Sequence, residues 1–272
     1  ICKLTLEFFA LYYFCRMGSV TLLLVVTAAV NFLYIGALFY YSKREVDYRL
    51  SFAYFSLPTL GNHLRYSFWY FQTTIATVLV FNAQVLMINA LLGTTSVARY
   101  LLVTRFFDVI RIGLTNFTQV LFPKVVYMEA EAKWLEIRHL FYKVLLWIAV
   151  LSGLVFLVMM TVGERAFIYW SKYSDVEILQ LYRFFAVFIM LIVIDNVAVV
   201  FISALKLNKL PTILSICQGV LGLGLGYLLL KRYGLVGVVC ASVISFFCTN
   251  MFFNTLYLIR NIRLKLLQFG FE

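Results

Sequence analysis

The sequence predicts an all-α polytopic membrane protein with about eight transmembrane helices, because the chain is very apolar, carries little charge and has long apolar runs. Of its 272 residues, 64% are hydrophobic and 13% are charged, and the mean hydropathy is +0.95. A soluble domain of this length shows far more polar surface to water. Most apolar runs reach the roughly 20 residues that a helix needs to cross the hydrocarbon core. No polar stretch is long enough to fold alone.

Polar clusters divide the chain into helices that are expected at 3–16, 19–41, 62–92, 97–121, 140–163, 179–205, 211–230 and 235–259. The helix at 3–16 is shorter than a membrane span and is interpreted as truncated. The chain opens on Ile1 without a signal-peptide pattern, so we expect a fragment that has lost upstream spans. Helix-breaking residues support the proposed ends, namely Gly18, Pro58, Gly61, Gly93, Pro123, Gly163, Pro211 and Gly234.

Two segments are interpreted as connectors rather than spans. Segment 42–61 is polar and aromatic, which predicts a cytoplasmic amphipathic linker lying along the membrane surface. Segment 129–143 alternates acidic and basic residues, which predicts a solvated helical connector with local ion pairs.

Lysine and arginine concentrate in alternate loops. The richer set lies at 42–66, 122–143, 206–209 and 260–265. The positive-inside rule places these loops and the C-terminus in the cytoplasm, with 261–272 as a cytoplasmic tail. The net charge of +11 is spread over short loops rather than gathered in one patch, so it indicates contacts with anionic membrane lipids and no nucleic-acid partner.

The most informative feature is a polar stripe on the helix at 97–121. Each charged residue near a bilayer centre costs about 2.5–3.5 kcal/mol, whereas each large apolar residue returns only about 0.3–0.6 kcal/mol. At about 100° per residue one arc collects the polar side chains, and we expect it to face a protein interior or a wet cavity. The arc holds Thr104, Arg105, Asp108, Arg111, Thr115, Asn116, Thr118 and Gln119, and the opposite arc is apolar.

Two interpretations of the stripe remain open. Arg105, Asp108 and Arg111 are spaced as i,i+3 ion pairs that lock helices together. Alternatively, the surplus of arginine over aspartate forms a cationic wall that binds an anionic headgroup, since guanidinium groups bind phosphate oxygens in bidentate fashion. The second interpretation makes Arg105, Arg111, Asp108, Gln119 and Thr115 candidate substrate-binding residues.

Other polar residues in the apolar runs have mostly structural interpretations. Asp195 is either a site for proton or cation coupling or a polar contact between helices. Gln84 is expected to bond to a neighbouring helix, and the glycines from 219 to 226 are expected to allow close packing. The five cysteines form no C-x-x-C pair and are interpreted as small packing residues. We find no catalytic arrangement, and we expect no enzyme, no cofactor and no metal site.

Four stretches resemble one known family when taken together in order. They are F-N-A-Q-V-L-M-I-N-A-L-L-G-T-T-S-V-A-R-Y (Phe81–Tyr100), V-L-F-P-K-V (Val120–Val125), A-L-K-L-N-K-L-P (Ala204–Pro211) and R-Y-G-L-V-G-V-V-C-A-S-V-I (Arg232–Ile244). With them, nearly the whole chain resembles the oligosaccharide flippases of the polysaccharide-biosynthesis branch of the MOP superfamily, which includes the O-antigen flippases.

The resemblance implies two six-helix lobes flanking a cavity that opens alternately to either side of the bacterial inner membrane. It implies transport of oligosaccharide linked to undecaprenyl pyrophosphate, for surface polysaccharide or lipopolysaccharide assembly, with polysaccharide polymerase and glycosyltransferases as partners. On this map 62–260 is the C-terminal lobe and 1–41 is the remnant of the N-terminal lobe. Many relatives have an acid where this chain has Gln84, so no coupling site is carried over to that position.

Two other functions remain open. A multidrug/cation antiporter of the same superfamily would need a net acidic cavity, which the excess of arginine in the stripe disfavours. A non-transporting component of a glycan assembly complex, such as a polymerase, would need a large periplasmic loop, and the longest loop expected on that side, 164–178, is modest.

Overall fold

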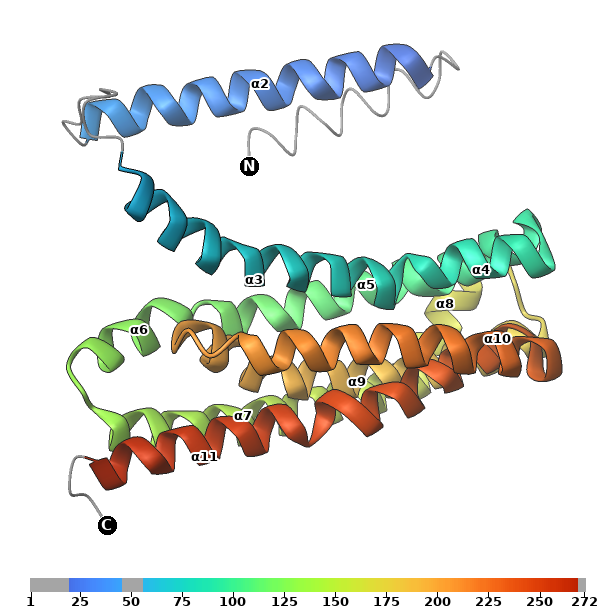
Figure 1. Ribbon diagram of the computed structural model, residues 1–272. Helices are drawn as coiled ribbons and strands as arrows, with labels where there is room; N and C mark the ends of the chain where they lie inside the picture. Colours follow the sequence, from blue (N-terminus) through green and yellow to red (C-terminus); the bar gives the residue numbers. More distant parts are fainter. Residues whose placement is uncertain (1–19, 46–55, 269–272) are drawn as a thin grey trace. The chain divides into compact units, whose positions relative to one another are not determined.

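A computed structural model describes residues 20–45 and 56–268, and every regular element in these ranges is a helix (Figure 1). The chain divides into two compact units, residues 1–60 and 61–272. We refer to the second as the C-terminal unit. The predicted helix at 3–16 lies outside the described residues.

The first unit contains helix α2 (Val20–Glu45), which matches the helix predicted at 19–41 but continues for four more residues. Lys43 and Arg44 in its last turn complement the negative end of the helix dipole. Of the predicted linker 42–61, the first residues therefore belong to α2 and the last belong to α3 (Leu57–Phe81). The middle of the linker lies outside the described residues.

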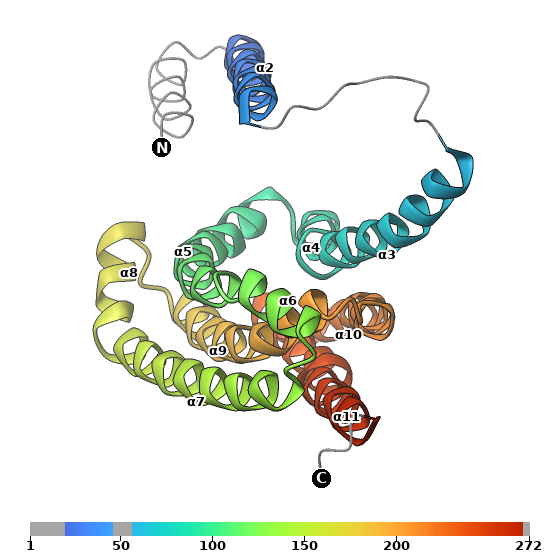
Figure 2. The same ribbon diagram turned by 90° about the vertical axis from the view of Figure 1, so that its left-hand side faces the viewer.

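Helix α9 (Val176–Ala204) forms the centre of the C-terminal unit (Figure 2). It packs against α5 (Thr94–Gln119), α6 (Phe122–Ala130), α7 (Trp134–Val158), α10 (Lys209–Phe246) and α11 (Phe253–Gln268). Its side chains are apolar almost all round, which is the pattern of a helix covered on every side. The helices around it bury one face and leave the other exposed, as with Leu146 and Trp147 of α7.

Helix α3 is followed by the shorter α4 (Ala83–Leu92), and the two together correspond to the single helix predicted at 62–92. The helical hydrogen-bonding pattern is interrupted only at Asn82. Gly93 then ends α4 with φ +80°, a conformation that glycine adopts without the steric penalty of a Cβ atom, and α5 begins at the next residue.

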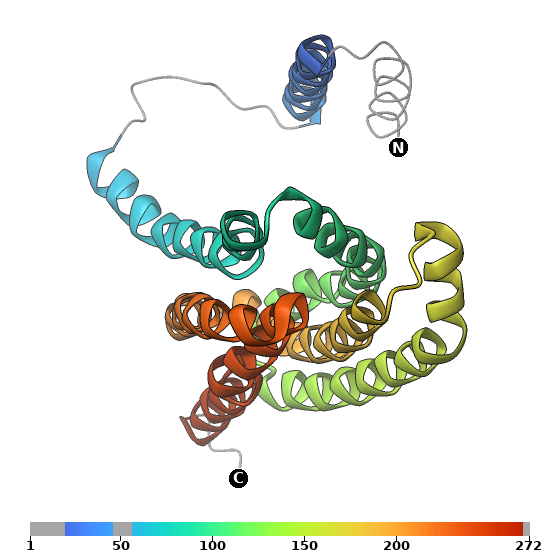
Figure 3. The ribbon, with the colours of Figure 1, turned by 90° about the vertical axis from the view of Figure 1, so that its right-hand side faces the viewer.

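Helix α10 is a hairpin of two antiparallel arms rather than one long rod (Figures 1 and 3). The reversal lies at Gly234, whose φ of 60° and ψ of −147° interrupt the helix. Across the hairpin, Gly222 faces Ser245 and Gly226 faces Ala241, while Asn250 bonds to Gln218. The predicted division at Gly234 is confirmed. The second arm continues through a π-helical turn, η3 (Phe247–Met251), into α11 and ends at Gln268 rather than 259.

Glycines 219, 222 and 226 lie against the side chains of Leu79, Ser245 and Met87, so the expected close packing is confirmed for these three. Gly224 points into open space. The packing interpretation of the cysteines is wrong for Cys217 and Cys248, which are exposed, because they lie on the outer faces of the hairpin arms.

The predicted helix end at Gly163 is wrong. Helix α7 continues through the π-helical turn η2 (Met159–Gly163) into α8 (Glu164–Ser171), and the whole segment is curved (Figure 2). The Tyr182 hydroxyl donates to the Met159 carbonyl oxygen at 2.9 Å, which takes this acceptor out of the regular helical ladder. Gly163 provides room for the tyrosine, because a Cβ there would lie 2.7 Å from the hydroxyl oxygen.

The single connector helix predicted at 129–143 is also wrong. Helix α6 ends at Ala130, Ala132 adopts a left-handed φ of 56°, and α7 begins at Trp134. The residues after 134 join α7 because Ile137 and Phe141 are fully buried. The expected local ion pair is present between Glu131 and Lys133 at 2.8 Å; its hydrogen bond lowers the pKa of Glu131 and raises that of Lys133.

The predicted tail at 261–272 is helical as far as Gln268, because Ile262 and Leu266 are buried. Residues 269–272 lie outside the described part of the chain.

Within the described ranges, five helical segments are long and apolar enough to cross a membrane, namely 25–44, 67–92, 134–171, 176–204 and 209–268. The last contains both arms of the hairpin. Helix α5 has spanning length but is not among them, because Arg105, Asp108 and Arg111 lie in its middle. The fold is therefore that of a helical, membrane-embedded protein.

We expect Gly237→Ala to destabilise the hairpin, because the added Cβ would lie 2.3 Å from the Leu229 carbonyl oxygen, a backbone atom that cannot move aside. Overpacking of this kind costs about 1–3 kcal/mol. Thermal unfolding in detergent should show a clearly lower midpoint. The matched control is Gly224→Ala, whose added Cβ meets nothing within 4 Å. Its unfolding midpoint should equal or exceed that of the unaltered protein. Equal midpoints for the two variants would contradict the hairpin packing.

Candidate functional site

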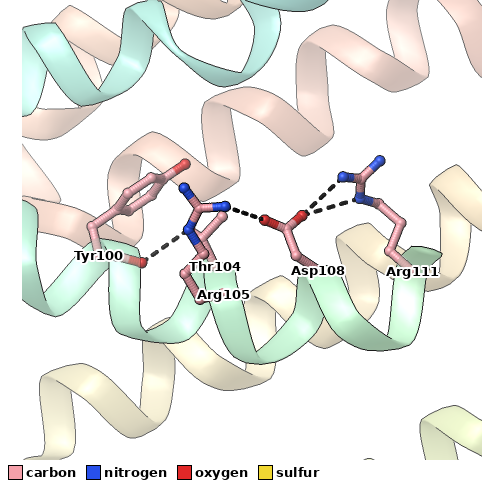
Figure 4. Close-up of polar contacts among 5 residues, drawn as sticks. All are labelled: Tyr100, Thr104, Arg105, Asp108 and Arg111. Atoms are coloured by element: carbon pink, nitrogen blue, oxygen red, sulfur yellow. Dashed lines mark hydrogen bonds and ion pairs between the residues drawn. The ribbon is translucent and has the colours of Figure 1, made fainter. Parts of the chain in front are cut away.

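The charged stripe predicted on α5 is continuous in the structure (Figure 4). Asp108 lies between two arginines and bonds to both. The Arg111 guanidinium donates to Asp108 Oδ1 through Nη2 at 2.9 Å and through Nε at 3.2 Å. On the other side, Arg105 Nη1 lies 3.7 Å from Asp108 Oδ2. One carboxylate therefore serves two guanidinium groups, which leaves the stripe with one uncompensated positive charge.

The two arginines differ in their surroundings. Arg111 is 27% exposed, and its guanidinium lies 5.3 Å from the centre of the Phe81 ring at the end of α3. The bidentate contact with Asp108 and the cation–π contact hold it in place and tie α5 to α3. Arg105 is 75% exposed within the C-terminal unit and has only the longer contact with Asp108. The ion-pair interpretation therefore describes Arg111 best, and Arg105 is the more exposed and more weakly held of the two arginines.

Helix α5 has three faces rather than the two expected from the sequence. The packed face holds Val103, Phe107 and Leu114, and the polar stripe lies along one edge of it. The apolar arc is divided, because Phe117 and Val120 are 67% and 77% exposed and form a surface suited to lipid.

The remaining residues of the stripe are not equivalent. Thr118 is buried and accepts a hydrogen bond from Asn196 Nδ2 of α9 at 2.5 Å, so it joins the packing of the unit. Thr115 is half-buried and bonds to the Ile112 carbonyl oxygen at 3.2 Å. Gln119 is exposed. Of the candidate binding residues, Arg105 and Gln119 therefore have the most exposed side chains.

A separate polar cavity of about 160 Å³ lies between α3, α9, the first arm of α10 and the segment from Phe246 to Asn254. Its lining includes Asp195 and none of the candidate binding residues of the α5 stripe. Asp195 is 8% exposed, and Asn254 Nδ2 donates to both of its carboxylate oxygens, at 3.2 and 3.0 Å. No other donor to Asp195 is found among the described side chains.

Two amide oxygens in the cavity wall have no hydrogen-bond partner. They are Oδ1 of Asn250 and Oδ1 of Asn254, both of which are buried. Asn250 uses its amide nitrogen on Gln218 Oε1 at 2.5 Å and on Ser215 Oγ at 3.2 Å, so its oxygen stays free. Burying such an acceptor without a partner costs about 1–3 kcal/mol. A carboxylate beside two free amide oxygens is an arrangement that accepts a proton or a small hard cation.

Four of the polar side chains in this cavity were missed by the sequence analysis: Thr212, Gln218, Asn250 and Asn254. Asn250 and Asn254 are four residues apart, and that spacing within an apolar helix was the available indication that they share a face. Their proximity to Asp195 is decided by the hairpin and by its packing on α9. Among the described residues, no group of three or more His, Cys, Asp or Glu residues is placed to hold a metal ion.

Gln84 forms the interhelical bonds expected of it. The Tyr100 hydroxyl of α5 donates to Gln84 Oε1 at 2.9 Å, and Gln84 Nε2 donates to Ser242 Oγ of α10 at 2.8 Å. Gln84 is 4% exposed. This network is a structural link between α4, α5 and the second hairpin arm.

No family model, curated protein or solved structure matches this chain. The class of protein is therefore defined by the fold and the two sites: a helical membrane protein with a cationic stripe on α5 and a buried carboxylate cavity beside α9.

We expect Arg111→Gln and Arg105→Gln to differ in stability. The Arg111 variant loses a bidentate hydrogen bond and a cation–π contact, so its free energy of unfolding should fall by about 1–2 kcal/mol. The Arg105 variant should unfold within about 0.5 kcal/mol of the unaltered protein, as is usual for exposed side chains. Thermal or denaturant unfolding in detergent measures both. Equal losses would contradict the distinction between a structural and a free arginine.

Proposed function

We propose that the protein flips lipid-linked oligosaccharide, carried on undecaprenyl pyrophosphate, across the bacterial inner membrane by alternating access, for surface polysaccharide or O-antigen assembly. The observation that carries this proposal is the exposed Arg105 on a helix of membrane-spanning length, in a stripe with a surplus positive charge. Charged residues within spans face cavities or binding sites rather than lipid. A pyrophosphate supplies the oxygens that a guanidinium binds in bidentate fashion.

The proposal includes an arrangement in the membrane. Residues 62–260 would form a six-helix lobe, residues 1–41 would belong to the preceding lobe, and the chain would have eight spans with the C-terminus in the cytoplasm. Two findings support six spans in the lobe: α10 consists of two antiparallel arms, and α5 has spanning length despite its charges. The stripe would face a water-filled space, where the headgroup crosses while the lipid tail stays in the bilayer.

The Asp195 cavity is the proposed site of coupling to an ion gradient. Binding of a proton or cation to Asp195 would neutralise a buried charge in the cavity whose wall also holds the free oxygens of Asn250 and Asn254. Phe81 connects the two sites, because it lines the cavity and also lies against the Arg111 guanidinium. A change in the cavity therefore has a direct route of contact to the stripe.

We expect Arg105→Gln to slow flipping by about 10- to 100-fold, the equivalent of one lost charge-assisted hydrogen bond to phosphate. Protein produced from its native gene is reconstituted in proteoliposomes, and exposure of a labelled lipid-linked sugar in the far leaflet is measured. Arg165→Gln, which removes an exposed arginine from α8, serves as the matched control and should flip at the unaltered rate. Normal flipping by the Arg105 variant would overturn the proposed charge-binding mechanism, and no flipping by the unaltered protein would indicate a non-transporting component.

We expect Asp195→Asn to abolish the dependence of transport on the ion gradient, because the neutral amide cannot exchange a charge with either side of the membrane. Gradient-driven flipping should fall at least about tenfold, as for a lost charged hydrogen-bond partner, whereas exchange without a gradient persists. Asp175→Asn at the start of α9 provides a control, since this carboxylate is 55% exposed and has only a long contact of 3.8 Å with Arg99. A variant that still responds fully to the gradient would exclude Asp195 as the coupling residue.

One observation favours a second function, a cation antiporter: the cavity contains a carboxylate and, among the described side chains of its lining, no positive charge. Efflux of cationic dyes from the same proteoliposomes distinguishes the two functions. An antiporter loses dye efflux in Asp195→Asn and keeps it in Arg105→Gln, whereas the proposed flippase transports no dye in either form.

A further inference from the structure

A groove between α7 and α11 is used by neither of the sites described above. The two helices run antiparallel and side by side (Figures 1 and 2). The groove holds about 100 Å³ and is lined by three residues of each helix, namely Arg138, Phe141, Tyr142, Ile259, Ile262 and Arg263.

The groove has a charged end and an apolar floor. Phe141 and Ile262 form the floor, and at most 1% of either residue is exposed. Tyr142 is 46% exposed and forms part of the wall. Arg138 and Arg263 line the same small space from facing helices, so each helix contributes one positively charged side chain. Neither arginine has an ion-pair or hydrogen-bond partner in the described part of the chain. Two unpaired like charges repel each other, and an anion between them removes that repulsion.

The position of the groove indicates the kind of anion. Arg138 lies one turn inside the start of α7, and Arg263 lies near the end of α11, which is the end of the apolar segment 209–268. This is the level at which lipid headgroups meet a spanning helix. About two helical turns further in from the arginines, Leu146 and Leu256 are 67% and 62% exposed on the two sides of the groove. They continue the apolar surface toward the bilayer centre.

We propose that this groove binds an anionic phospholipid, with its phosphate between Arg138 and Arg263 and its acyl chains along the exposed leucines. Basic pockets between spanning helices bind anionic headgroups in this way. A zwitterionic lipid binds less well, because its own ammonium group is repelled by the two guanidinium groups. The apolar continuation selects a lipid over free phosphate. The groove shares no lining residue with the α5 stripe or the Asp195 cavity.

The test is native mass spectrometry of the detergent-purified protein titrated with phosphatidylglycerol, and with phosphatidylcholine in parallel. The unaltered protein should retain phosphatidylglycerol preferentially. The double variant Arg138→Gln/Arg263→Gln should bind phosphatidylglycerol about 30-fold more weakly. Each arginine near an anionic headgroup contributes a factor of about five to the affinity, and the two factors multiply. Both side chains are exposed, so gel filtration should show an unchanged folded protein.

The matched control is Lys143→Gln/Arg260→Gln, which removes two exposed charges from the same helices without touching the groove. Its affinity for phosphatidylglycerol should stay within about twofold of the unaltered protein, as surface charges outside contact distance are screened. Equal weakening in both double variants would overturn the site in favour of unspecific charge attraction. Displacement of the lipid by millimolar inorganic phosphate would overturn it in favour of a free-phosphate site.

Discussion

The constraint on which the rest of this structure depends is that a lipid tail offers no hydrogen bond, so polar groups in the spanning helices need partners from the protein itself. Most of them have one. Gln84 is satisfied by Tyr100 and Ser242, and Thr118 accepts from Asn196 across the α5–α9 interface. The bond from Tyr100 joins the consecutive helices α4 and α5, and the other two join helices that are far apart in the chain. Each bond fixes one helix against another while it removes an unpaired polar group from the interior.

Several exceptions to this rule lie at the two candidate sites, whereas the unpaired indole nitrogen of Trp134 lies outside both. Arg105 shares the only carboxylate of its stripe and remains exposed, and Asn250 and Asn254 leave amide oxygens unpaired beside Asp195. A buried acceptor without a partner lowers stability, so the function proposed here gives each exception a partner from outside the chain: an anion at the stripe and a proton or cation in the cavity. Phe81 lies between the two and gives the proposed coupling a direct path of contacts.

Glycines allow the close approaches that bring these groups together. Positions 219 and 226 let the first hairpin arm approach α3 and α4 so closely that an added Cβ would lie 2.8 Å from a neighbouring side chain, and position 222 lies almost as close to Ser245 of the second arm. Gly234 reverses the chain with a positive φ. The hairpin then carries Asn250 and Asn254 back to the level of Gln218 and Asp195, and the cavity exists because of this return.

The sequence by itself determined the helical, membrane-embedded class, the approximate helix positions, the reversal at Gly234 and the charge surplus on α5. These depend on composition, on local conformational preference and on the helical period, all of which are properties of neighbouring residues. Only the tertiary structure decided that Arg111 contacts Phe81 while Arg105 stays exposed, and that α7 continues past Gly163. It also decided that five polar residues from α10 to α11 line one cavity with Asp195. The physical reason is that a helical wheel gives the direction of a side chain, whereas its exposure and its partners depend on which other helices pack around it.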